Sequence, residues 1–82
     1  MGEERIELDD TDVVDEDWYG RDLTGARFAR VRFLEVDLTE AVISGATFDE
    51  CIFRGVTLNA AAVTDSAFTT CTFRRTSFSM AT

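Results

Sequence analysis

The sequence predicts an all-β protein that winds as a solenoid with four sides to each turn. Three observations carry this prediction. A large apolar residue recurs at every fifth position, a compact residue usually stands two positions before it, and the pattern repeats with a second period of twenty. A five-residue period is neither the 3.6 of an α-helix nor the 2 of a β-strand. It requires a chain that turns a corner after every five residues.

The fivefold row runs unbroken from residue 23 to residue 78 and forms the predicted interior. Compact residues such as Ala26 and Val31 stand two positions earlier, and only Arg21 breaks that second row. A narrow tube has space on each side for one large and one small side chain, so the other three residues of each five should point outward. The members of the large row are Leu23, Phe28, Phe33, Leu38, Ile43, Phe48, Phe53, Leu58, Val63, Phe68, Phe73 and Phe78.

The period of twenty means that four five-residue sides close one coil, so 82 residues make about four coils. Residues twenty apart then lie on neighbouring coils, about 4.8 Å apart. Phe28, Phe48 and Phe68 fall in one such column, and we expect them to stack as an interior ladder. Gly25 and Gly45 fall in another column and predict a corner with positive φ.

The triplets Val36-Asp37-Leu38 and Ala26-Arg27-Phe28 resemble the repeat of the pentapeptide-repeat family. Its motif is Ala, then Asp or Asn, then Leu or Phe, then two free residues. The resemblance covers residues 23–78 firmly and residues 6–22 loosely, and it departs at the middle position, where Asp22 and Asp37 are the only Asp or Asn among the twelve repeats. It implies a right-handed quadrilateral β-helix with Phe and Leu ladders inside.

Residues 1–22 are predicted to form an acidic N-terminal cap or a degraded first coil. Leu8, Val13 and Trp18 lie in register with the interior row, which favours the coil. Terminal repeats of solenoids are often irregular. The alternative is an acidic disordered tail that ends near Asp17, because acid-rich segments with few apolar residues stay solvated.

Residues 23–82 are predicted to form the pentapeptide-repeat β-helix. The chain reaches Thr82 still in rhythm, with no capping segment after Phe78. An uncovered last coil exposes aromatic side chains and free backbone groups, which is a template for association. We therefore expect either a truncated repeat protein or a homodimer paired through this coil.

The net charge of −8 lies entirely at the N-terminus. Residues 1–17 hold nine acids against Arg5, whereas residues 18–82 hold seven acids and seven arginines. This disfavours direct binding of nucleic acid, which needs a basic surface. It permits a basic protein partner. The sequence shows neither a signal peptide nor a long apolar run, so we expect a cytoplasmic protein that does not contact the membrane.

The residue types present do not assemble an enzyme site, a cofactor site or a metal site. The chain has no His, and no nucleophile–base pair or phosphate loop can be built from its motifs. Cys51 and Cys71 stand one coil apart at the compact position. We expect two reduced cysteines that act as small apolar side chains, because stacked parallel neighbours do not suit an unstrained disulfide.

Two groups of outward residues are candidate partner contacts. The acids Asp9, Asp10, Asp12, Asp15, Glu16 and Asp17 form the acidic segment, read either as a solvated cap or as a contact for a basic partner. The second group, Arg54, Arg74 and Arg75, should share one side of the tube near Glu35, either as a solvated face or as a patch for an acidic partner. We also expect Arg30 to pair with Glu50, twenty residues away.

Two functions fit these features. The first is a non-enzymatic scaffold or protein-interaction module with an unassigned partner. The alternative follows from the resemblance: bacterial members of the family mimic DNA, bind DNA gyrase or a related topoisomerase and protect it from quinolones or other antibiotics. Against this alternative, the chain is short and its repeat body carries no net charge.

Overall fold

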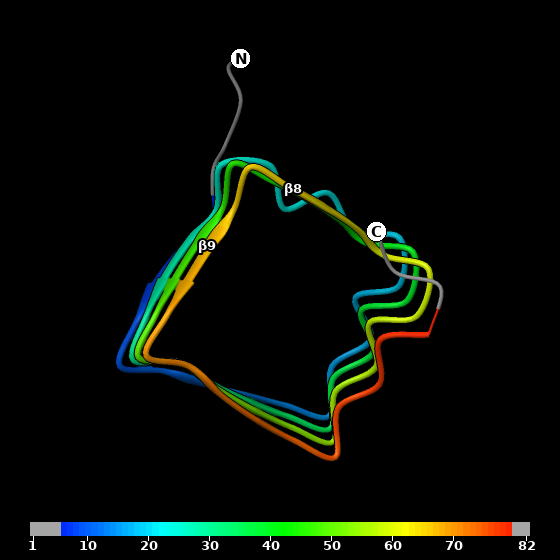
Figure 1. The fold of residues 1–82 in the computed structure, drawn as a ribbon. Coiled ribbons are helices and arrows are strands. Elements are labelled where there is room, and N and C mark those ends of the chain that lie inside the picture. Colours follow the sequence, from blue (N-terminus) through cyan, green and yellow to red (C-terminus); the bar gives the residue numbers. More distant parts are fainter. Residues whose placement is uncertain (1–5, 80–82) are drawn as a thin grey trace.

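A computed structural model describes residues 6–79 and confirms the predicted all-β solenoid. Viewed along its axis, the chain traces a four-sided coil whose successive turns lie above one another (Figure 1). These residues contain no helix, and so none that could cross a membrane. Glu3, Glu4 and the chain end at Thr82, on which parts of the sequence prediction rest, lie outside the described residues.

Three of the four sides carry parallel β-sheets built from strands of three residues each. The first side holds β1 (Glu7–Asp9), β3 (Arg27–Ala29), β6 (Thr47–Asp49) and β9 (Ala67–Thr69); the second holds β2 (Asp12–Val14), β4 (Arg32–Leu34), β7 (Ile52–Arg54) and β10 (Thr72–Arg74); and another holds β5 (Val42–Ser44) and β8 (Ala62–Thr64). On the remaining side, single bridges join Asp17, Asp37, Thr57 and Ser77. Every pair is parallel and offset by twenty residues.

Stacked aromatic rings fill the interior in two ladders. Phe48 lies 4.9 Å from Phe28 and 4.6 Å from Phe68, with interplanar angles of 22° and 0°. Phe53 repeats this arrangement with its own neighbours, Phe33 at 4.9 Å and Phe73 at 4.7 Å. These spacings match the separation of hydrogen-bonded strands, so backbone pairing and ring stacking support the same register. The predicted Phe ladders are therefore confirmed.

The two ends of the described coil differ in how well they cover the interior. In the first coil, Val13 and Trp18 are only 6% and 8% exposed, and the Arg21 guanidinium lies 4.7 Å from the centre of the Trp18 ring. In the last coil, Phe73 and Phe78 are 39% and 49% exposed. Arg21 stands where a compact residue is expected because its guanidinium packs on the Trp18 ring. A cation–π contact favours this packing.

Every side of the coil ends on a residue with positive φ. The described residues show this at each fifth position from Asp10 to Arg75, and Gly20, Gly25, Gly45 and Gly55 account for four of these positions. The predicted positive φ at Gly25 and Gly45 is confirmed, with values of 72° and 64°. The other corners place Asp, Glu, Arg, Ala or Thr in a region that costs a non-glycine residue roughly 1–2 kcal/mol.

The corners are of two kinds. Four close with a backbone hydrogen bond: the amides of Arg21, Ala26, Ala41 and Ala61 donate to the carbonyls of the large residues three positions earlier, as in a type II turn. At the first three of these, an Asp precedes the large residue and accepts a hydrogen bond from the amide two positions later; these residues are Asp17, Asp22 and Asp37. The middle-position Asp of the motif therefore marks the hydrogen-bonded corner.

At the open corners the free carbonyl is available to the coil above. The compact side chain twenty-three residues later donates to it in four places: Cys51 to Phe28, Ser66 to Ile43, Cys71 to Phe48 and Thr76 to Phe53. Above the hydrogen-bonded corners at Trp18, Leu23 and Leu38, the same position holds Ala in every case: Ala41, Ala46 and Ala61. The residue type at the compact position therefore depends on whether the corner beneath it is hydrogen-bonded or open.

The conformational strain at the corners can be tested at Thr70, which is a β-branched residue with a φ of 54°. β-branched residues avoid this region more strongly than others. Glycine relieves that strain but costs roughly 0.5–1 kcal/mol in unfolded-state entropy. We expect Thr70→Gly to raise the free energy of unfolding by about 1 kcal/mol, measured by urea denaturation. Thr69→Gly, in the adjacent strand, is the matched control and should lower it; destabilisation by both substitutions would contradict a strained corner.

Candidate functional site

The interior of the coil offers no site, because apolar side chains fill it. Among residues 6–79, no polar or charged residue is buried, and no buried side-chain polar atom lacks a hydrogen-bond partner. The same residues include no group of three or more Cys, Asp or Glu side chains placed to hold a metal ion. Any functional contact made by the described coil must therefore use outward side chains.

Three of the candidate acids in the first coil are engaged by arginines of the second. Arg30 donates from Nε to Asp10 at 2.8 Å and from Nη2 to Asp9 at 2.5 Å. Arg32 holds both carboxylate oxygens of Asp12, at 3.0 and 2.8 Å. The expected pairing of Arg30 with Glu50 is wrong, because two adjacent carboxylates on the coil below attract the guanidinium more strongly than one above.

The remaining candidate acids face a different side. They lie on the side that the Asp17–Asp37 bridge joins, where the first coil carries Asp15, Glu16 and Asp17 at the corner and the start of the side. The second coil continues this side with Glu35, Asp37 and Glu40. We call these six residues the acidic strip. None of the three ion pairs found among residues 6–79 involves them, and no arginine lies between them on this side.

Tyr19 extends the acidic strip with an exposed phenol. A hydrogen bond to Glu40, followed by the charge of that carboxylate, raises the pKa of the Tyr19 hydroxyl. The raised pKa keeps the phenol protonated beside the strip. In the third coil the same side is neutral, with Thr57, Asn59 and Ala60 in the corresponding positions, so the strip spans two coils.

The candidate arginines Arg54, Arg74 and Arg75 do lie together. Arg54 and Arg74 are register partners in β7 and β10, and Arg75 follows directly at the corner. The three side chains line one surface hollow, which we call the arginine hollow. Glu35 lies beside it: a Cβ at Gly55 would be 2.7 Å from the Glu35 carboxyl carbon.

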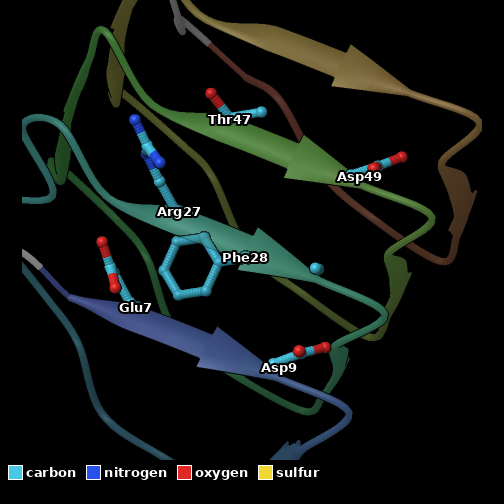
Figure 2. Close-up of a pocket in the computed structure, with 7 residues that line it drawn as sticks. Glu7, Asp9, Arg27, Phe28, Thr47 and Asp49 are labelled. Carbon is cyan, nitrogen blue, oxygen red and sulfur yellow. The ribbon is translucent and has the colours of Figure 1, made fainter.

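A second hollow lies on the first side, over β1, β3 and β6. Figure 2 shows its outward side chains in two rows, with Glu7, Arg27 and Thr47 in one and Asp9 and Asp49 in the other. In the register of the sheet, Ala29 stands between Asp9 and Asp49, and its small side chain accounts for the depression. Sequence reasoning did not single out this hollow, although a small residue between two acids in a twenty-residue column is visible in the sequence.

The two cysteines are free thiols, as expected, and both serve the packing of the coil. Burial raises the pKa of the Cys51 thiol and of the Cys71 thiol. Each donates to a main-chain carbonyl of the coil below, Phe28 and Phe48 respectively. A raised pKa reduces the thiolate fraction on which nucleophilic cysteine chemistry depends.

Comparison with known proteins agrees with this geometry. A family model described as "Pentapeptide repeats (8 copies)" matches residues 22–55, which include β3 to β7. Residues 22–55 of the chain are pentapeptide repeats, as the sequence resemblance predicted. No curated protein matches it. The pentapeptide repeats build a solenoid of stacked coils, an architecture that serves as a scaffold and presents an extended binding surface.

The Asp10–Arg30 contact of this pentapeptide-repeat protein predicts a pH-dependent stability. The hydrogen bond from Arg30 is the main cause that lowers the pKa of Asp10 below its ordinary value of 3.8. A lowered folded-state pKa contributes stability that is present above pH 3.8 and is lost as the pH falls through the folded value. Urea midpoints measured below about pH 4 should therefore fall less steeply in Arg30→Gln than in the wild type.

Arg27→Gln is the control for this experiment, because Arg27 is an outward arginine of β3, the strand that Arg30 directly follows, and makes no ion pair with residues 6–79. It should keep the wild-type slope. Equal acid slopes for all three proteins would show that the Arg30 contact does not set the titration of Asp10.

Proposed function

We propose that this pentapeptide-repeat protein is a non-enzymatic interaction module that binds a protein partner through the acidic strip. The proposal rests on how charged side chains are distributed between the sides of the coil. Asp9, Asp10 and Asp12 are neutralised within the coil, whereas no residue of the acidic strip makes an ion pair with residues 6–79. An uncompensated row of carboxylates favours a partner with a basic surface and accelerates its association.

The rigidity of the coil supports this function. Asp17 and Asp37 are held by the bridge between their coils, and each accepts a hydrogen bond from the amide two positions later. Carboxylates fixed at one strand spacing lose little freedom on binding, which favours affinity. The closed apolar interior leaves outward contact as the role available to the described coils.

The test compares two triple variants that change the net charge equally. Asp15→Asn, Glu16→Gln and Asp17→Asn neutralise half of the acidic strip, and Asn at position 17 keeps the acceptor for the Tyr19 amide. Asp9→Asn, Asp10→Asn and Asp12→Asn neutralise the paired acids. In affinity capture with quantitative mass spectrometry, we expect the strip variant to lose a basic protein that the wild type and the control variant retain.

Loss of the captured protein at about 0.5 M salt should accompany this result, because exposed charge contacts are screened. Equal capture by the strip variant and the wild type would contradict the proposal. Thermal melts of both variants separate lost binding from lost folding.

A second candidate is protection of a type II topoisomerase by DNA mimicry, and the acidic strip is the feature that favours it. Two coils of carboxylates cover only about 10 Å along the axis at the strand spacing, a short length of duplex. If this candidate holds, the wild-type protein alters supercoiling by purified gyrase or relieves its inhibition by a quinolone, and the strip variant does neither. Unchanged supercoiling and drug sensitivity with the wild type would eliminate it while leaving the interaction module standing.

Pairing of two copies through the last coil is a further part of the proposal. Phe73 and Phe78 are the exposed aromatic residues of the described coil end. Their burial in a dimer would remove apolar surface from water. Phe78→Ser should then convert a dimer to a monomer in sedimentation equilibrium; a monomeric wild type would overturn this part alone.

A further inference from the structure

The arginine hollow is lined by three arginine side chains that the backbone brings to neighbouring positions. The amide of Glu35 donates to the carbonyl of Arg54 at 2.9 Å, and the amide of Gly55 donates to the carbonyl of Arg74 at 3.0 Å. These bonds fix the backbone where β7 and β10 end, at Arg54 and Arg74, and Arg75 stands at the corner that follows β10. The side chains of Arg54, Arg74 and Arg75 then line the hollow between them.

None of these three arginines makes an ion pair with residues 6–79, and unlike Arg27, which also makes none, they lie together. Arg30 and Arg32 are neutralised by aspartates, and Arg21 covers the Trp18 ring. The hollow gathers three like charges with no ion pair in this part of the chain. Residues 66–79 contain no acid at all, so the last coil has no carboxylate of its own to offer them.

Glu35 is a negative group beside the arginine hollow. Its carboxyl group lies over Gly55, in the space that a Cβ would occupy. Gly55 therefore admits the carboxylate at the rim, between the acidic strip and the arginines. One carboxylate leaves the three guanidinium groups with a surplus of two positive charges.

We propose that the arginine hollow binds a phosphate group. Phosphate carries a charge near −2 and three or more acceptor oxygens, which matches the surplus charge and the several donors that converge here. A single carboxylate would be satisfied by one bidentate arginine and would not require three. This inference goes beyond the proposed interaction module, because it concerns another surface and a ligand of opposite charge.

The experiment titrates the full chain with sodium phosphate at constant ionic strength and follows the arginine Nε–H signals by NMR. We expect saturable shifts of Arg54, Arg74 and Arg75, and none of Arg30 and Arg32. Sodium chloride at matched ionic strength should not reproduce them. Linear shifts without saturation, or equal shifts in chloride, would overturn the proposal.

Matched variants identify the donors. Arg74→Gln should weaken phosphate binding by about tenfold, the loss of one charge-assisted contact. Arg27→Gln, at an outward arginine on another side, should leave the affinity unchanged, and Glu35→Gln should tighten binding by removing the competing carboxylate. Equal weakening by Arg74→Gln and Arg27→Gln would show only a general charge effect and would overturn the site.

A phosphoserine peptide and its unphosphorylated form distinguish the source of the group. Tighter binding of the phosphoserine peptide than of inorganic phosphate would place the phosphate on a protein partner. Binding of inorganic phosphate with no gain from the peptide would indicate a free anion. Of these arms only Glu35→Gln changes the acidic strip, so failure of the phosphate titration leaves the interaction module untouched, and failure of the module leaves the hollow standing.

Discussion

A residue in the left-handed region ends every side of the coil, and this constraint fixes the period on which the rest of the structure depends. Because the chain turns after each five residues, four sides close after twenty, and each residue meets its counterpart one coil away. The carbonyls and amides then pair between coils, and Phe28, Phe48 and Phe68 stack at 4.6–4.9 Å. Backbone register and ring contact reinforce one another, which is the consistency expected of a sequence that specifies one fold.

The corners also explain which residues occupy the smaller interior positions. Where the turn closes its own hydrogen bond, the carbonyl has a partner already, and the residue above it is Ala. Where the turn stays open, Cys, Ser or Thr above donates to the free carbonyl in four places, and Val fills the position in the others. The cysteines are thus members of a structural series with Ser66 and Thr76, since all four satisfy a buried acceptor.

Much of the fold could be predicted from the sequence because its information is periodic. The position of Phe48 in a ladder and the contact of Arg54 with Arg74 both follow from a spacing of twenty. The partner of Arg30 could not be predicted, because its column holds Asp10 on one side and Glu50 on the other. The neighbouring Asp9 decided between them. The acidic strip could be predicted only in part: Asp15, Glu16 and Asp17 belong to the predicted acidic segment, whereas the acids of the second coil join them because the coil brings residues twenty apart to one side.

The same sorting explains how a coil with a neutral repeat body can still present charged surfaces. Interior positions are dictated by the packing, so variation is confined to outward positions, and neighbouring columns can carry opposite charge. One corner column changes from acid to base along the axis: it holds Asp15, Glu35, Gly55 and Arg75 in successive coils. The glycine leaves space for the Glu35 carboxylate. A rigid solenoid therefore carries an acidic and a basic surface side by side, because the fold makes no demand on the charges that point outward.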